Sequence, residues 1–202
     1  MRKHKNFGRG LFLLPICVIM KWVMQVDKES KLPKRKEIRL KSFDYSSPGV
    51  YFITICTESR KNYFWNASLD PQAFEWHSVG ANCVRPQNLP LSDIGNTVSV
   101  ELEKWHKAYD AVSLCSYVIM PNHLHILVFI SADEYGRPQS APTIDRMVKQ
   151  FKGAVTKTVG WSIWQKSFME HVIRNKQDFE TKSKYICENP LRWYYDELYA
   201  EE

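Results

Sequence analysis

The sequence predicts an α+β domain built on an antiparallel sheet of the ferredoxin-like type, with two helices on one face. Segments rich in β-branched and aromatic residues alternate with segments whose apolar residues recur at helical spacing. Their order is β-α-β-β-α-β, followed by one further helix that is free to bring side chains to the sheet. The 202 residues suffice for one ordinary domain with a short appendage.

The first half of the pattern begins with a strand predicted at residues 49–57, which follow a Ser-Pro-Gly turn and read GVYFITICT. Residues 66–91 contain Pro, Gly and Asn with little periodicity, so they predict a long loop. A helix is predicted to begin at Asp93. Its apolar residues at helical spacing are Ile94, Val98, Leu102 and Trp105.

The second half contains two strands, predicted at residues 114–120 and 123–130, that flank a Pro-Asn turn. A second loop is predicted at residues 131–142. The remaining predicted elements are a basic amphipathic helix at 143–159, a strand at 168–173 and a last helix at 178–188, which ends near Pro190.

Charge is distributed unevenly along the chain. The net charge is +6, but residues 1–41 contain twelve basic and three acidic residues, a net charge of +9, and residues 42–202 carry −3. We expect residues 1–41 to form a poorly ordered basic leader or arm and residues 42–202 to form the folded domain. Within that domain, residues 137–184 have a local net charge of +6, which indicates a polyanionic partner.

The N-terminal segment includes ten apolar residues, 11–20, after a basic stretch, a pattern similar to a secretory signal. Lys21 ends this run, no small-residue cleavage motif follows, and ten residues cannot span a bilayer as a helix. We therefore expect no membrane partner. Five scattered cysteines without a C-x-x-C pair exclude a disulfide framework or a zinc knuckle and favour a cytoplasmic protein.

Two short patterns can carry chemistry. His123 and His125 alternate along the third predicted strand, so both imidazoles point to one face and can converge on a cation. Tyr185 and Asn189 are four residues apart and share a helical face, where they supply a hydroxyl nucleophile and a hard oxygen ligand. Each pattern alone also fits ordinary packing histidines, a packing tyrosine and an Asn-Pro helix stop.

Together these patterns resemble a known family. Residues 116–128, SYVIMPNHLHILV, are similar to the signature of the single-tyrosine transposases of the His-hydrophobic-His (HUH) superfamily. Residues 44–57, DYSSPGVYFITICT, and residues 163–193 resemble the first strand and the C-terminal block of the REP-associated tyrosine transposases. The resemblance covers most of residues 35–195 and implies the same ferredoxin-like fold.

The resemblance implies an endonuclease that cleaves and rejoins single-stranded DNA through a 5′-phosphotyrosine, without ATP, at REP-type hairpins. Tyr185 would be the nucleophile, and His123, His125 and Asn189 would bind the metal. Related insertion-sequence enzymes use a glutamine in place of Asn189. The absence of thiolates from this set favours Mg²⁺ or Mn²⁺ as the cofactor.

The predicted DNA contacts are basic residues in the 137–184 window: Arg146, Lys149, Lys152, Lys157, Arg174, Lys182 and Lys184. Four aromatic residues near them were candidates for stacking on unpaired bases: Phe151, Trp161, Trp164 and Phe168. The resemblance leaves the oligomeric state open between a monomer and a homodimer.

Two alternatives remain at this point. A domesticated relative would recognise structured DNA or RNA without cutting it. An unrelated metal-dependent hydrolase would use the His-x-His pair and leave Tyr185 without a role. A complete set of His123, His125, Tyr185 and Asn189 favours the active transposase, because a decayed enzyme is expected to lose at least one of them.

Overall fold

The structure is a computed structural model that describes residues 47–66, 89–132 and 143–200. The predicted leader at 1–41 and most of the two predicted loops lie outside the described residues. In the described part, the elements follow the predicted order. They are β1 (Gly49–Cys56), η1 (Glu58–Arg60), α2 (Asp93–Glu103), α3 (Trp105–Ala108), β2 (Val112–Ile119), β3 (His123–Ile130), α4 (Ile144–Val159), β4 (Met169–Ile173), α5 (Lys176–Glu188) and η2 (Asn189–Tyr195).

Local capping explains where several helices begin. The Ser92 hydroxyl accepts a hydrogen bond from the Gly95 N–H, and the Thr143 hydroxyl caps α4 in the same way. Asn175 Oδ1 accepts from the Asp178 N–H, so α5 begins at Lys176, two residues before the predicted start. At the other end of α4, Gly160 takes a left-handed conformation, with φ of 90°, and ends the helix.

The sheet has the strand order β2-β3-β1-β4, and each neighbouring pair is antiparallel. This is the order of the predicted ferredoxin-like sheet. β1 and β3 occupy its centre, and every residue of both strands is buried. Their pairing places Thr54 beside His125 and Cys56 beside His123. The predicted histidine strand is therefore held in the middle of the sheet.

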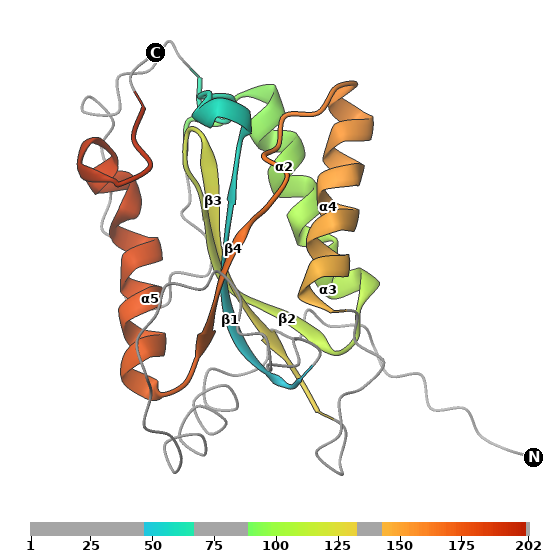
Figure 1. The fold of residues 1–202 in the computed structure, drawn as a ribbon, viewed down its shortest axis with the longest axis vertical. Helices are drawn as coiled ribbons and strands as arrows, with labels where there is room; N and C mark the ends of the chain where they lie inside the picture. Colours follow the sequence, from blue (N-terminus) through green and yellow to red (C-terminus); the bar gives the residue numbers. More distant parts are fainter. Residues whose placement is uncertain (1–46, 67–88, 133–142, 201–202) are drawn as a thin grey trace, which may run out of the picture.

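Helices cover both faces of the sheet (Figure 1): α2, α3 and α4 lie on one side and α5 lies on the other. The first layer is the predicted pair of crossover helices, with α3 as a short addition after α2. The α5 layer explains why β1 and β3 are buried along their whole length, since neither face of these strands meets water.

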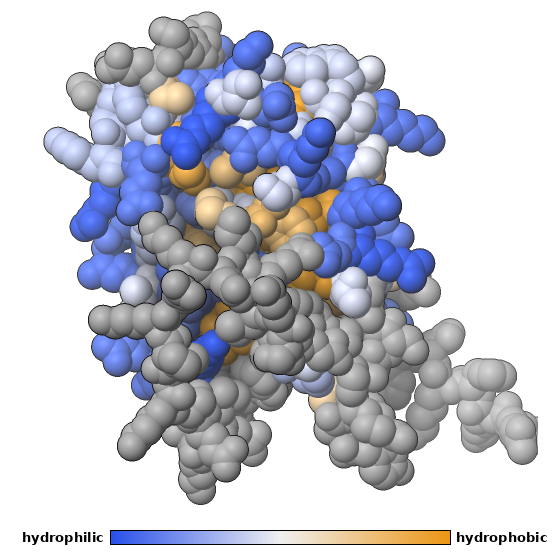
Figure 2. Space-filling view, in the orientation of Figure 1, coloured by the Kyte–Doolittle hydropathy of each residue, from blue (hydrophilic) through white to orange (hydrophobic). Residues whose placement is uncertain are grey.

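The two layers differ in how they pack. α4 buries five residues, Ile144, Met147, Val148, Phe151 and Val155, whereas α5 buries only Ile186. Phe151 packs against Trp105 and Trp164, with ring centroids 5.7 and 5.6 Å away. Figure 2 shows apolar residues between charged side chains on the face seen along β4. The burial of Phe151 and Trp164 excludes the stacking on bases expected for them, and Trp161 stays 47 % exposed.

Within residues 47–66, 89–132 and 143–200, no helix combines the length and apolar character that a membrane span requires. The three cysteines in this part, Cys56, Cys115 and Cys187, are free thiols.

Candidate active site

The sheet face under α5 contains a cluster of polar side chains at the His123 end of β3. The Nε2 atoms of His123 and His125 lie 3.0 Å apart, as expected for alternate residues of one strand that face the same layer. The rings of Tyr185 and His125 meet edge to face, with centroids 5.0 Å apart. Phe52 stacks on His125 from β1. The structure thus brings the predicted histidines and the predicted tyrosine together.

The protonation of His123 is set by its neighbour Asn122. The Asn122 amide nitrogen donates to the backbone oxygens of Arg60 and Leu198, over 3.1 and 2.9 Å. Asn122 Oδ1 is therefore the atom that faces His123 Nδ1, at 2.8 Å, and it accepts the Nδ1–H. Because a neutral imidazole carries one proton, His123 Nε2 presents a lone pair toward His125.

His125 has a more adaptable partner. Its Nδ1 lies 2.8 Å from the Thr54 hydroxyl, which can either donate or accept. When the hydroxyl donates, His125 Nε2–H bonds to His123; when it accepts, both Nε2 atoms present lone pairs to one point. The second arrangement is the one that binds a cation.

Burial keeps both imidazoles neutral. Burial, with a smaller contribution from the Arg60 charge, lowers the pKa of His123 to about 3. Burial and then the neighbouring His123 lower the pKa of His125 well below its ordinary value. Both histidines are therefore ready to act as metal ligands at neutral pH, without first losing a proton.

Asp196 completes the cluster. Its Oδ2 accepts hydrogen bonds from the Tyr185 hydroxyl (3.0 Å) and from Asn189 Nδ2 (2.8 Å). Its Oδ1 accepts from the Leu198 N–H at 2.7 Å. Burial, followed by the Asp196 charge, raises the pKa of Tyr185 above its ordinary value. The tyrosine is thus a neutral phenol in contact with a proton acceptor.

His123, His125 and Asp196 form a group that can hold a metal ion, because one candidate ligand atom from each lies within 4.8 Å of the others. Sequence reasoning missed Asp196. It lies just beyond η2, eleven residues from Tyr185, and neither helical nor strand spacing relates the two. Only the return of the chain through η2, anchored by the buried Trp193 against His123, brings this carboxylate back to the site.

Asn189, the predicted third ligand, is the C-cap residue of α5 and is 2 % exposed. Its Nδ2 bonds to Asp196, and its Oδ1 is buried without a hydrogen-bond partner. A buried carbonyl oxygen without a partner fits a cation ligand, because leaving it unbound is unfavourable. The donor set near the two histidines therefore contains a carboxylate and a free amide oxygen.

Comparisons with known proteins identify relatives of this chain. No protein-family model matches the chain. It is 31 % identical over 186 residues to a Haemophilus influenzae protein described as "Uncharacterized protein", a match that covers 83 % of this chain and 94 % of that protein. Over 101 residues it is 28 % identical to a "Putative REP-associated tyrosine transposase" of the same species, covering 46 % of this chain and 56 % of that one. In sequence, the chain is therefore similar to the REP-associated tyrosine transposases.

Among solved structures, the chain is similar to a REP-associated tyrosine transposase bound to a REP hairpin. The sequence identity is 18 % and the TM-score 0.47, and the match covers 81 % of this chain and 74 % of that one.

The basic residues predicted to contact DNA divide between the two helical layers of the protein. On the α5 side, Lys182 Nζ lies 4.9 Å from the centroid of the Phe52 ring, next to Tyr185. Lys184 is exposed and pairs with Glu188 at 3.6 Å. Arg174 is half-buried, just before α5. Lys182 thus lies beside an aromatic ring that contacts both His125 and Tyr185.

On the α4 side, Arg146, Lys149 and Lys157 are exposed, with the sheet between their helix and Tyr185. Lys152 is half-buried, and its ammonium donates to the backbone oxygens of Gln165 and Ser167, over 2.8 and 2.9 Å. The structure therefore gives Lys152 a role in fixing the segment that leads into β4.

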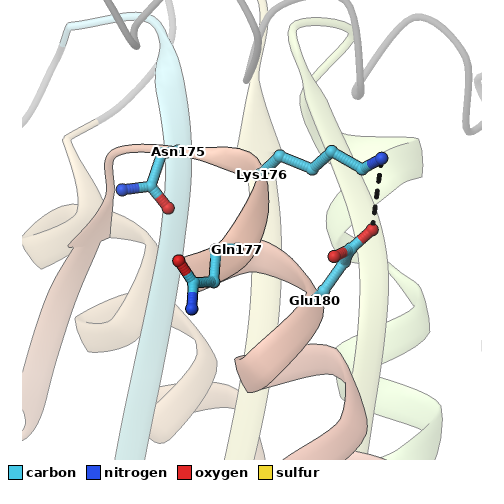
Figure 3. A pocket seen from close by; sticks show the side chains of 4 residues that line it. All are labelled: Asn175, Lys176, Gln177 and Glu180. Atoms are coloured by element: carbon cyan, nitrogen blue, oxygen red, sulfur yellow. Dashed lines mark ion pairs between the residues drawn. The ribbon is translucent and has the colours of Figure 1, made fainter.

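Two further features lie at the first turn of α5. His171 on β4 bonds to Asp178 at 2.8 Å and is about half exposed. A shallow pocket on the same turn is lined by Asn175, Lys176, Gln177 and Glu180, with an ion pair between Lys176 and Glu180 at 3.6 Å (Figure 3). Tyr185 lies more than one helical turn beyond this pocket, so the pocket is separate from the candidate active site.

Proposed function

We propose that this protein cleaves and rejoins single-stranded DNA by transesterification, with Tyr185 as nucleophile, at DNA hairpins. The observation that carries the proposal is the placement of the Tyr185 hydroxyl against Asp196, beside the paired Nε2 atoms of His123 and His125. Such a constellation suits an attack on phosphorus, because it combines a nucleophile, a proton acceptor and a cation site.

In the proposed step, the Tyr185 oxygen attacks a backbone phosphorus and its proton passes to Asp196. The new bond is a 5′-phosphotyrosine, and the bond to the 3′ oxygen of the preceding nucleotide breaks, so that this oxygen leaves as a 3′-OH after taking a proton. Tyr185 needs this proton acceptor because burial and the Asp196 charge raise its pKa. Rejoining reverses the step and uses no further energy source.

The proposed metal ligands are His123, His125 and Asp196, with Asn189 Oδ1 as the fourth donor. A divalent ion held there would polarise the phosphate and offset the charge that develops in the transition state. We favour Mg²⁺ or Mn²⁺ over zinc, because this set combines two imidazoles with carboxylate and amide oxygens and contains no thiolate.

The proposed partner is single-stranded DNA that carries a hairpin. This class of ligand is chosen because the chain is similar to a solved REP-associated tyrosine transposase described as bound to a REP hairpin. We assign Arg174, Lys182 and Lys184 as phosphate contacts to the part of the single-stranded DNA that reaches Tyr185. Arg146, Lys149 and Lys157, behind the sheet, would contact a more distant part of the hairpin. Exposed Trp161, which packs edge to face on Tyr63, offers a surface for an unpaired base.

We also propose that residues 42–202 form the catalytic domain and that residues 1–41 act as a basic arm. The reaction would take place in the cytoplasm, where the free thiols of Cys56, Cys115 and Cys187 persist.

The test is to incubate the protein with labelled, hairpin-bearing single-stranded DNA and Mn²⁺ or Mg²⁺. We expect a covalent protein–DNA adduct that disappears in Tyr185→Phe and in EDTA. The matched control is Tyr195→Phe, because Tyr195 is 90 % exposed and follows the same helix. This variant should form the adduct at the parent rate.

Three other outcomes would contradict the proposal. Equal cleavage by Tyr185→Phe would remove the nucleophile assignment. Binding in both metals without cleavage would identify a domesticated binding module. Cleavage without an adduct would identify a hydrolase that uses the histidine pair alone.

A further inference from the structure

The turn after β1 places an arginine at the edge of the candidate active site. Ser59 and Arg60 both take left-handed backbone conformations, with φ of 54° and 56°, although neither is a glycine. Such conformations are unfavourable for residues with a Cβ and persist only where neighbouring groups hold them. Here the Asn122 amide donates to the Arg60 oxygen, and the Thr57 hydroxyl donates to the Lys61 oxygen.

Asn122 links this turn to the metal ligands. Its amide nitrogen donates a hydrogen bond to the Arg60 backbone oxygen, and its amide oxygen accepts a hydrogen bond from His123 Nδ1–H. The position of Arg60 is therefore coupled to the orientation of a proposed metal ligand. An ordinary surface turn does not require this constraint.

The side chain of Arg60 extends toward the carboxylate that holds Tyr185. Its Nη1 donates to the backbone oxygen of Glu197, the residue after Asp196, at 3.4 Å. Within residues 47–66, 89–132 and 143–200, no carboxylate forms an ion pair with Arg60. The guanidinium is exposed and keeps donors available.

We propose that Arg60 binds a backbone phosphate of the DNA single strand, at or next to the phosphate that Tyr185 attacks. This inference rests on the proposed function. A guanidinium matches two phosphate oxygens with two parallel N–H donors, which fixes the phosphate in orientation as well as in charge. The strained turn would hold those donors in place before the strand arrives.

The test uses the hairpin-bearing oligonucleotide of the cleavage assay, with binding measured at several salt concentrations in Tyr185→Phe protein. Arg60→Asn removes the charge and suits the left-handed conformation, since asparagine adopts it readily. We expect the slope of log K against log salt to fall by about 0.7, the value for one single-strand phosphate. In protein with Tyr185 intact, Arg60→Asn should slow adduct formation at least 10-fold.

Two comparisons separate a phosphate contact from a loss of structure. Arg60→Lys should restore the salt slope but only part of the rate, because an ammonium lacks the planar pair of donors. Lys104→Gln, which removes an exposed charge from α2 in the opposite layer, should leave slope and rate unchanged. A further series of oligonucleotides carries one neutral methylphosphonate each, at successive positions. At one position near the cut, the methylphosphonate should weaken DNA binding by the parent protein but leave binding by Arg60→Asn unchanged.

An unchanged salt slope in Arg60→Asn, or the same methylphosphonate profile in variant and parent, would overturn the Arg60 assignment while the parent still forms the adduct. If the parent neither binds nor cleaves the DNA, the proposed function fails and the Arg60 assignment fails with it.

Discussion

The hydroxyl of Tyr185 donates a hydrogen bond of 3.0 Å to Asp196, a residue that returns to the site only after the chain has passed through η2. This contact joins the proposed nucleophile to a carboxylate that also lies beside both histidines. One side chain thus connects the tyrosine and the cation site.

Asp196→Asn tests this connection. The substitution keeps the shape of the side chain but removes the proton acceptor and an anionic ligand. We expect adduct formation to slow by about 10²-fold or more, the usual cost of losing a positioned base. Glu197→Gln, at the exposed neighbouring carboxylate, is the matched control and should react at the parent rate. If Asp196→Asn forms the adduct at a rate within twofold of the parent rate, Asp196 is not the proton acceptor for Tyr185.

Thr54→Val tests the assigned hydrogen bond to His125. The valine is similar in size but offers no acceptor for the Nδ1–H, so the tautomer with a free Nε2 becomes less favourable. We expect the affinity for Mn²⁺, measured by calorimetry, to fall about 10- to 100-fold. Thr97→Val on exposed α2 is the control. Unchanged Mn²⁺ affinity in Thr54→Val would show that the hydroxyl does not orient the ligand.

Metal binding should also stabilise the folded protein. At a Mn²⁺ concentration 100 times its Kd, the free energy of unfolding is expected to rise by about 2.7 kcal/mol, and EDTA should reverse this. His125→Ala should abolish the increase. His171→Ala, at an exposed histidine that pairs with Asp178 outside the site, should retain it. The same increase in His125→Ala would place the metal elsewhere.

The stability of the metal-free protein should depend on pH through the buried histidines. His123 has a folded-state pKa of about 3, below its unfolded value near 6.5, so the unfolded state binds more protons between these values. Stability is therefore greatest above pH 6.5 and falls toward pH 3, by at most about 1.4 kcal/mol per pH unit for one histidine. Thermal unfolding at several pH values measures this, and His123→Gln should show a shallower decline. An equal slope in both proteins would contradict the assignment.

A pair of glycines tests the packing of the helices on the other face. A Cβ on Gly95 would lie 2.1 Å from the Phe64 backbone oxygen, whereas a Cβ on Gly153 meets nothing within 4 Å. Gly95→Ala should lower the free energy of unfolding by about 1–3 kcal/mol or more, because backbone must shift. Gly153→Ala should raise it by up to about 1 kcal/mol, the difference in helix propensity. Urea unfolding measures both, and a stable Gly95→Ala protein would contradict the close approach of α2 to Phe64.

Much of the fold and part of the site follow from the sequence, because they depend on neighbours along the chain. The strand period places His123 and His125 on one face, and the helical period predicts α4 and α5. Capping residues define where α2 and α4 begin. The motifs around these residues also indicate the transposase family. These features are local, so a pattern of a few residues carries them.

Only the tertiary structure decided which distant groups meet at the histidine pair. Asp196 and Arg60 reach it through η2 and through a left-handed turn, and neither has a spacing that relates it to His123. The ammonium of Lys152, a predicted DNA contact, bonds to backbone oxygens of a neighbouring segment. α4 and α5 both carry predicted DNA contacts, yet they lie on opposite faces of the sheet. The physical reason is that long-range packing and hydrogen bonding choose these partners, and no local period records that choice.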